Sequence, residues 1–516
     1  MIALWVIFTA IAILLSLHVG LVWLDAAFLL PVAALLAFVM RRRTRFRIAI
    51  PRKAFLLCLL LGVLLAYPLL LRGVPAAADP AQTITLRVLD ERIPPTYAPY
   101  ADLSFTYQYG FHLFANLFAD LLPAPDFLVL WFFGALFGAL EAVLLFAFAH
   151  ALSGKEEAGW GAAILLLGSK AVYRDVLVGG FPTILAVDLL LVTFLAFSQK
   201  SRLAYVCFPA LAAVHPQIAL FGGVLLALYG LLYHRLRRVL LLLPSLVLAL
   251  PALFTTYAAI LSAAGPSFAP SPSIQALLLV PLFIGIVPSA VAALGAAWLA
   301  KRRLLSPEKR FALLLLAITV GLYVAMEAAG FQFVARLMEG AIIAAALFGG
   351  LTLADLPRHR IPAFAAVLLV GVLATVASGE LNELRFDGKL SPEEQGFAAA
   401  FAGFDPGREW TFFFTPGGPK IAEYADKIPY DGKEDWFLPY FERQVFPASL
   451  QELDQRHAAA QEILAQSCVS CARDLPVRYI VVNTALYSPL PDQPAFSWND
   501  FQVYANAPPG TGPPLA

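Results

Sequence analysis

Acidic side chains in the first long polar stretch are the residues best suited to catalysis. This stretch, residues 73–126, follows an apolar segment that ends at Leu71. Asp79 comes soon after that segment, and Asp90 and Glu91 form an adjacent pair farther along. A carboxylate held at a membrane boundary can take the proton of an acceptor hydroxyl while a lipid-borne phosphate leaves. We therefore treat Asp79 as the first candidate for a general base and the Asp90–Glu91 pair as its competitor.

Structural roles compete with these catalytic ones. Asp79 precedes a segment, residues 81–88, that is compatible with a surface helix, and its carboxylate would then cap that helix. The Asp90–Glu91 pair is flanked by two arginines, so it can form a salt-bridged turn or bind a divalent cation such as Mg²⁺ or Mn²⁺. The sequence leaves these alternatives open, and it assigns no cofactor with certainty.

Aromatic and imidazole groups follow in the segment FTYQYGFHLFANLFADLL. The candidates to line a sugar or acceptor pocket are Tyr107, Tyr109 and His112. His112, Asn116 and Asp120 recur every four residues and so form one polar stripe on a helix. We expect residues 105–122 to form an amphipathic helix that lies in the outer membrane interface and does not cross the bilayer.

Later turns carry groups that suit a phosphate or a sugar. Arg174 and Asp175 lie in the turn at residues 173–179, and Arg336 precedes a long apolar run. A guanidinium group can hold a phosphate through two parallel hydrogen bonds. The structural alternatives are an Arg174–Asp175 pair and an arginine that only extends its head to the membrane surface. His215 either binds a sugar hydroxyl or is a packed, hydrogen-bonded residue.

Composition predicts a polytopic membrane protein. The chain is 60% hydrophobic and 14% charged, with a mean hydropathy of +0.76, whereas soluble proteins carry about 25% charged residues. Its apolar runs correspond to about 13 spans of ~20 residues each. The net charge of +1 gives no reason to expect a nucleic acid partner. Ionisable residues within the runs are few, with Asp188 the main exception, which argues against an ion-coupled transporter.

Lysine and arginine predict how the spans are oriented. Turns rich in these residues alternate with turns that are poor in them. The basic turns are residues 41–53, 200–202, 235–238, 301–310 and 358–360. This alternation predicts a multi-pass protein of the cell membrane with a cytoplasmic N-terminus. The loop at residues 73–126 and the C-terminal part of the chain are then outside. No cleavable signal peptide is expected, because the first apolar stretch runs into a second.

Three regions follow from these patterns. Residues 1–53 form an N-terminal transmembrane hairpin with a basic cytoplasmic turn, residues 54–379 form the transmembrane core, and residues 380–516 form a small α/β domain outside the membrane. In that domain REWTFFFTP and VRYIVVN are typical of buried strands, and ASLQELDQRHAAAQEILAQ is typical of a helix. Cys468 and Cys471 form a single CxxC motif, which does not predict zinc and which permits a local disulfide outside the cytoplasm.

The layout resembles that of the GT-C glycosyltransferases, which are polytopic membrane enzymes. The resemblance rests on Asp79 just after a span, on the entry YQYGFHLF to an interfacial helix, on Asp175 at the outside end of a later span, and on the arginine of FVARLMEGAIIAAALFGG. It extends over residues 54–378 in layout. This chain departs from the family in lacking a second acid beside Asp79 and in having Gln108 where a proline is common. The choice between Asp79 and the Asp90–Glu91 pair therefore stays open.

The resemblance implies a GT-C-like helical core and an inverting transfer of a hexosyl or pentosyl group. A polyprenyl-phosphate-linked sugar would be the donor, and a lipid, glycan or protein the acceptor. Asp79 would deprotonate the acceptor, and Arg174 and Arg336 would stabilise the phosphate leaving group. The alternatives are a lipid or solute carrier and a catalytically inactive assembly protein of the cell envelope.

Overall fold

The structure is a computed structural model, and its described residues make up most of the helical core and of the C-terminal domain. They are residues 2–19, 50–53, 55–56, 59–60, 96–97, 100–104, 109–119, 126–169, 180–250, 252–253, 280–281, 284–302, 306–328, 337–356, 370–371, 390–407, 409–415, 418–425, 427–429, 459–460, 462–475 and 477–506. Every structural statement below concerns these residues.

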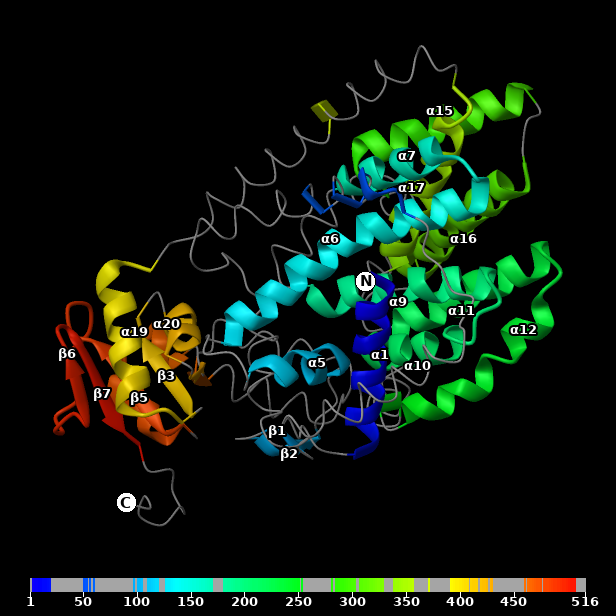
Figure 1. Ribbon diagram of the computed structural model, residues 1–516. Helices are drawn as coiled ribbons and strands as arrows, with labels where there is room; N and C mark the ends of the chain where they lie inside the picture. The colour runs from blue at the N-terminus through cyan, green and yellow to red at the C-terminus, as the bar shows by residue number, and fades with distance from the viewer. Residues whose placement is uncertain are drawn as a thin grey trace.

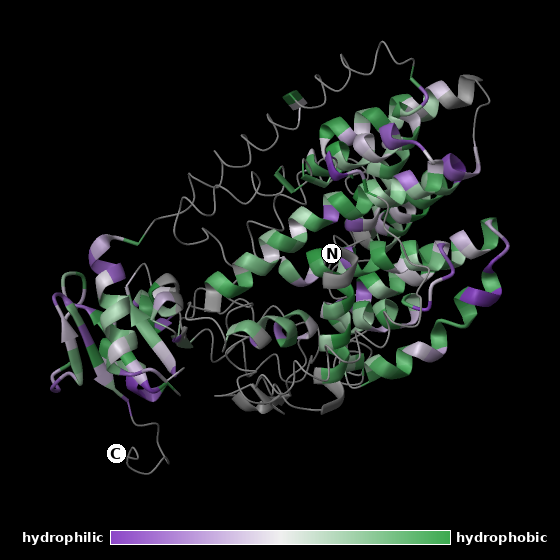
Figure 2. Cartoon of the chain, viewed as in Figure 1, coloured by the Kyte–Doolittle hydropathy of each residue, from purple (hydrophilic) through white to green (hydrophobic). Residues whose placement is uncertain are grey.

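Apolar helices form the larger part of the molecule (Figures 1 and 2). Three helices in the described ranges are long and apolar enough to cross a membrane: α6 (Asp126–Ser153), α9 (Phe181–Ser198) and α16 (Pro307–Ala328). Further apolar helices pack around them: α1 (Ile2–Val19), α7 (Glu156–Leu167), α10 (Ala204–Val214), α11 (Pro216–Leu232), α15 (Ile286–Arg302) and α17 (Leu337–Leu353). A mostly helical core with several apolar helices agrees with the predicted class, and the figure of about 13 spans stays a prediction.

Short elements connect and cover these helices. The strands β1 (Thr96–Tyr97) and β2 (Tyr100–Ser104) pair antiparallel, and α5 (Gly110–Ala119) follows them. Beyond α11 the chain forms α12 (Leu236–Leu240) and then the 3-10 helix η1 (Leu243–Ala249), which packs on α10. The central helix is α9, whose residues are buried along nearly the whole of its length against α6 and α10.

Small residues allow the tightest helix contact in the core, between α7 and α17. A methyl group added at Gly350 would lie 2.4 Å from the backbone nitrogen of Ala162, and one added at Gly161 would lie 2.9 Å from the Cα atom of Gly350. Glycines on facing helices let backbones approach closely, which is how helices associate in an apolar solvent. The glycine pair in LFGGLTL is therefore the sequence signal for the close contact between α7 and α17.

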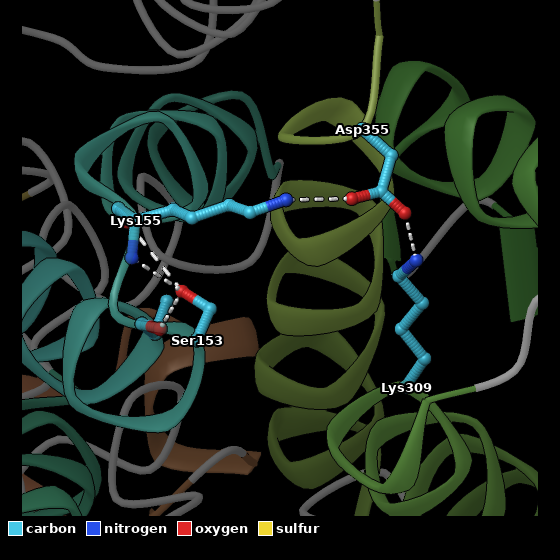
Figure 3. A network of polar contacts seen from close by, with 5 residues as sticks. Ser153, Lys155, Lys309 and Asp355 are labelled. Atoms are coloured by element: carbon cyan, nitrogen blue, oxygen red, sulfur yellow. Dashed lines mark hydrogen bonds and ion pairs between the residues drawn. The ribbon is translucent and has the colours of Figure 1, made fainter.

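One carboxylate ties three helix ends together (Figure 3). Asp355, just beyond α17, accepts from Lys155 Nζ at 2.9 Å through Oδ1 and pairs with Lys309 through Oδ2. Lys155 lies in the turn after α6, and Lys309 lies in the first turn of α16. Burial raises the pKa of the Asp355 carboxyl, but the hydrogen bonds from Lys309 and Lys155 outweigh it and hold that pKa below its ordinary value.

The C-terminal part is an α/β unit, which Figure 1 shows beside the helical core. Its five-stranded sheet has the order β4-β3-β5-β7-β6. The strands are β3 (Trp410–Phe414), β4 (Ile428–Pro429), β5 (Tyr479–Asn483), β6 (Phe496–Trp498) and β7 (Phe501–Ala505). β3 is parallel to β4 and to β5, with Thr411 opposite Tyr479, and the two remaining pairings are antiparallel. Both predicted strands are confirmed, as β3 and β5.

Helices complete this unit. α19 (Pro392–Phe404) begins with a capping box between Ser391 and Glu394, packs against α20 (Gly418–Tyr424), and covers the sheet with the stacked rings of Phe397 and Phe401. Of the predicted helix at residues 448–466, the described residues 459–460 and 462–465 are helical.

A buried lysine fixes the loop after α19. Lys427 is fully buried, pairs with Asp405 at 3.3 Å and donates to the backbone oxygens of Asp405 and Gly407. Its ammonium lies 5.0 Å from the ring centre of Phe401. Burial raises the pKa of the Asp405 carboxyl, but the hydrogen bonds from the Gly407 backbone and from Tyr479, together with Lys427, hold it below its ordinary value.

The two cysteines of the CxxC motif are joined. Cys468 and Cys471 form a disulfide at the start of the 3-10 helix η4 (Val469–Asp474). Cys207, in α10, is buried and free. The sequence alone left the disulfide open, because it depends on the compartment.

Candidate functional site

Helix α5 carries the described part of the predicted polar stripe into the protein. It begins at Gly110, later than the expected start near residue 105, and Tyr109 lies just before it. His112 is 0% and Asn116 1% exposed, because α1, α6, α9 and α10 surround the helix. Its 10 residues extend about 15 Å, half of a ~30 Å hydrocarbon core. The residues that follow Ala119 lie outside the described ranges, so it stays a prediction that the helix lies in the outer interface and does not cross.

Gly110 lets α5 touch the end of α10. A methyl group at this position would lie 2.8 Å from the backbone oxygen of Ala213 and 3.0 Å from the Cα atom of Val214. These distances leave no room for any side chain. The contact places the start of α5 beside the end of α10, which His215 follows. In the sequence, the glycine of YGFH is the signal for this close approach.

His215 lies at the junction of α10 and α11, where it is 2% exposed. Its Nδ1 accepts from the backbone nitrogen of Ile218 at 3.5 Å, and Pro216 occupies the first position of α11. The side chain therefore caps α11, which is the hydrogen-bonded role foreseen as the structural alternative. A neutral imidazole that accepts at Nδ1 carries its proton on Nε2, so that atom is a donor.

Two more helices begin at the same end of the core. The Phe181 ring, at the start of α9, lies 5.8 Å from the Phe111 ring of α5, and it packs over Gly134 of α6. Gly340, in the first turn of α17, packs against the Phe221 ring near the start of α11. The polypeptide segments that enter α9 and α17 therefore start from the end of the core at which α5 meets the α10–α11 junction.

Most of the predicted charged groups lie on those segments or in the loop before α5. Arg174 and Asp175 precede α9, and Arg336 is the residue before α17. These three residues lie outside the described residues, together with Asp79, Asp90, Glu91 and Tyr107. Their roles stay predictions.

Besides Asp188, the structure buries two acids of the core, Glu141 and Glu339, and Glu141 lies near Asp188. Asp188, in α9, is 0% exposed, and within the described part of the chain neither carboxylate oxygen has a hydrogen-bond partner. Glu141 of α6, which is 3% exposed, interacts with it electrostatically. The sequence analysis named Asp188 alone, and the signal for Glu141 was a single acid within the apolar run GALEAVLL.

Metal ligands are not assembled within the described ranges. No group of three or more histidine, cysteine, aspartate or glutamate side chains there could hold an ion. The acids considered for Mg²⁺ or Mn²⁺, Asp90 and Glu91, lie outside those ranges. A divalent-cation site at Asp90 and Glu91, in the loop before α5, therefore stays a prediction.

Comparison with known proteins gives matches among solved structures. A scan of protein-family models finds no match, and no curated protein matches the chain. The arabinofuranosyltransferase AftD from mycobacteria is similar over 85% of this chain and 37% of its own, with 17% identity and a TM-score of 0.47. The oligosaccharyltransferase AglB from Archaeoglobus fulgidus, in complex with an inhibitory peptide and a dolichol-phosphate, is similar over 84% of this chain and 69% of its own, with 12% identity and a TM-score of 0.41.

The apo form of the Archaeoglobus fulgidus oligosaccharyltransferase is similar over 84% of this chain and 70% of its own, with 13% identity and a TM-score of 0.47. This chain spans about 37% of the length of AftD. At these identities and scores no residue role is transferred to it.

Proposed function

We propose that the chain is an integral membrane glycosyltransferase. It moves a sugar from a polyprenyl-phosphate donor to an acceptor hydroxyl on the extracytoplasmic side. The observation that carries the proposal is the contact between the start of α5, which carries the buried His112, and the end of α10, which the buried His215 follows, at the end of an apolar core where α9 and α17 begin. Hydroxyl and imidazole groups bind sugar hydroxyls, and arginines on the entering segments bind phosphate. The apolar spans offer a lipid-facing route for the polyprenyl chain.

The reaction is a single displacement at the anomeric carbon. The acceptor oxygen forms the new bond to that carbon, while the bond from the carbon to the phosphate oxygen breaks. The leaving electron pair stays on polyprenyl phosphate, and the acceptor proton passes to the general base. Attack from the face opposite the leaving group inverts the anomeric configuration.

Each candidate residue has a separate task in this scheme. Asp79 is the base, with the Asp90–Glu91 pair as the competing site. Arg174 and Arg336 neutralise the charge that develops on the phosphate, and Asp175 orients Arg174. Tyr107, Tyr109 and His112 contact the sugar or the acceptor, and His215 donates through Nε2.

The side of the membrane is supported by the C-terminal domain. Disulfides persist in oxidising compartments and are rare in the cytoplasm. The Cys468–Cys471 bond therefore favours an extracytoplasmic position for this domain. By the alternation of the basic turns, the loop at residues 73–126 is on the same side.

The test is release of lipid phosphate. Purified protein is incubated with labelled polyprenyl-phosphate sugars and an acceptor mixture, and free polyprenyl phosphate is measured. Asp79→Asn should lower turnover by about 10²–10⁴ with little change in stability, since asparagine caps a helix as well as aspartate does. Asp500→Asn, the same chemical change at an exposed residue of the C-terminal domain, is the matched control.

Other outcomes discriminate between the candidate bases. Normal turnover by Asp79→Asn with loss of turnover on Glu91→Gln would assign the base to the Asp90–Glu91 pair. Absence of lipid phosphate with every sugar donor would reject the transferase.

One observation favours a second candidate, a lipid or solute carrier. Asp188 and Glu141 place two acids in the interior of the core, where relays of coupled carriers are found. A carrier predicts movement of labelled lipid across proteoliposomes without any cleavage of the sugar–phosphate bond. It also predicts loss of that movement on Asp188→Asn, with no effect of Asp79→Asn.

A further inference from the structure

The end of the core opposite His215 carries a basic surface that the proposed reaction does not use. Three helix ends meet there around an aromatic cluster. The Tyr229 ring of α11 lies 5.5 Å from Phe311 of α16 and 6.0 Å from Phe197 of α9. Phe194 of α9 lies 6.2 Å from Phe311. These contacts fix the end of α9, the end of α11 and the start of α16 side by side.

Arg235 fastens the turn after α11 to the end of α9. Its Nη1 donates to the backbone oxygen of Ser198 at 2.8 Å, and its guanidinium lies 5.9 Å from the Tyr229 ring centre. This arginine is therefore structural. Its contacts hold the turn that follows α9 beside α12, so that the basic residues of the two segments lie on one surface.

The remaining basic residues of this surface have no such task. Four are exposed and one is half-buried, and none has an ion pair to a described residue. They are Lys200, Arg202, Arg237, Arg238 and Arg310. The single acid on these three segments within the described ranges is Glu308, which is half-buried. We call these five residues the basic edge.

Exposed leucines adjoin the basic edge. On α12 and just beyond it, Leu236 is 38%, Leu240 57% and Leu241 51% exposed. Figure 2 shows the hydrophilic start of α12 between hydrophobic segments. A soluble anionic partner would pair with the arginines and leave the leucines in water. A bilayer surface covers both, because its phosphates pair with the cations while its acyl chains cover the leucines.

We propose that the basic edge binds the headgroups of anionic phospholipids. Guanidinium and ammonium groups of Arg237, Arg238, Lys200 and Arg202 contact the phosphates, and the leucines of α12 lie among the upper parts of the acyl chains. This places α12 in the plane of the membrane surface on the side opposite the candidate active site. The proposal is independent of the transferase activity.

The test compares two lipids on the whole protein. The full chain is reconstituted in phosphatidylcholine vesicles that contain a trace of spin-labelled phosphatidylglycerol or spin-labelled phosphatidylcholine, and the relative association of the two probes is measured. The wild type should prefer phosphatidylglycerol, and added salt should weaken that preference. Arg237→Gln with Arg238→Gln should reduce it by about fivefold for each charge removed.

A matched variant tests whether the lipid preference comes from the basic edge or from the positive charge of the protein as a whole. Arg473→Gln with Arg478→Gln removes the same charge from two residues of the C-terminal domain, each in an exposed pair, and should leave the preference unchanged. Equal association of both probes with the wild type would overturn the proposal, and so would an equal loss in the two variants. Inorganic phosphate that displaces the probe better than chloride at matched ionic strength would assign the edge to a soluble phosphate and reject lipid. Unchanged thermal unfolding of both variants in neutral lipid shows that the fold is intact.

Discussion

At the scale of single residues, Gly110 is the position of the candidate site with the least room for a side chain. Gly110→Ala forces a methyl group against the Ala213 oxygen and the Val214 Cα atom. Backbone atoms on both sides must shift, so we expect about 1–3 kcal/mol of destabilisation and reduced turnover. Thermal unfolding and the lipid-phosphate assay measure the two effects. Gly321→Ala is the control, because the space around that exposed glycine of α16 is open and alanine favours a helix.

A second prediction concerns the buried acid of α9. Asp188→Asn keeps the shape of the side chain and removes a buried carboxyl that lies near Glu141. An uncompensated buried charge is costly, so the variant should unfold at the wild-type temperature or above it. A clear fall in that temperature would mean that the Asp188 carboxyl is paired in the folded protein.

Some of the candidate residues could be named from the sequence, and others could not. Tyr109 and His112 were predictable because they share a short polar segment, and His215 because it interrupts an apolar run. The contact between α5 and the end of α10 was not predictable, because it depends on a close approach at Gly110 between segments that lie far apart in the chain. Glu141 was missed since one acid within an apolar run has no partner in sequence.

At the scale of elements, Asp355 provides the sharpest test. Asp355→Asn removes the link between the turn after α6, the start of α16 and the end of α17. Lys309 is mostly buried and would lose its partner, so the expected loss is about 1–3 kcal/mol. Asp492→Asn breaks the exposed pair with Arg473 and should cost less than about 1 kcal/mol. Denaturant unfolding of both variants in the same detergent compares them.

The same carboxyl predicts a dependence of stability on pH. Its folded-state pKa lies below the ordinary value of 3.8. The stabilisation is therefore complete above the unfolded pKa and is lost as the pH falls through the lower folded value. Between neutral pH and strongly acidic pH, the wild type should lose more stability than Asp355→Asn does. Parallel pH profiles of the two proteins would contradict this.

Elements were predictable where one pattern decides them. β3 and β5 were foreseen because aromatic and β-branched residues cluster in them, and the long apolar helices because of their length. The start of α5 was placed too early because Tyr109 fits the aromatic pattern, although the helix begins only at the glycine that touches α10. The order of the sheet could not be foreseen, because it depends on pairings between distant segments.

At the scale of the whole molecule, the two ends of the core should face different compartments. A cysteine at Ser497, exposed on β6, should react with a membrane-impermeant maleimide added to intact cells. A cysteine at Arg310, exposed at the basic edge, should react only after the membrane is opened. Cys58, which lies outside the described residues, is replaced by serine in both variants; of the other cysteines, Cys207 is buried and Cys468 and Cys471 are bonded. Labelling of both positions from the same side would reject the predicted topology.

The short helices of the α10–α11 hairpin determine how deep in the bilayer a substrate must reach. α10 has 11 residues and α11 has 17, which correspond to about 17 Å and about 26 Å, whereas a bilayer core is ~30 Å thick. If the basic edge marks one face of that core, His215 lies several ångströms beneath the opposite face. A sugar phosphate that reaches this histidine must then descend below the lipid headgroups, and the lipid that carries it can stay embedded throughout. The depth of the hairpin would in this way select against water-soluble donors, which have no anchor to draw them below the headgroups.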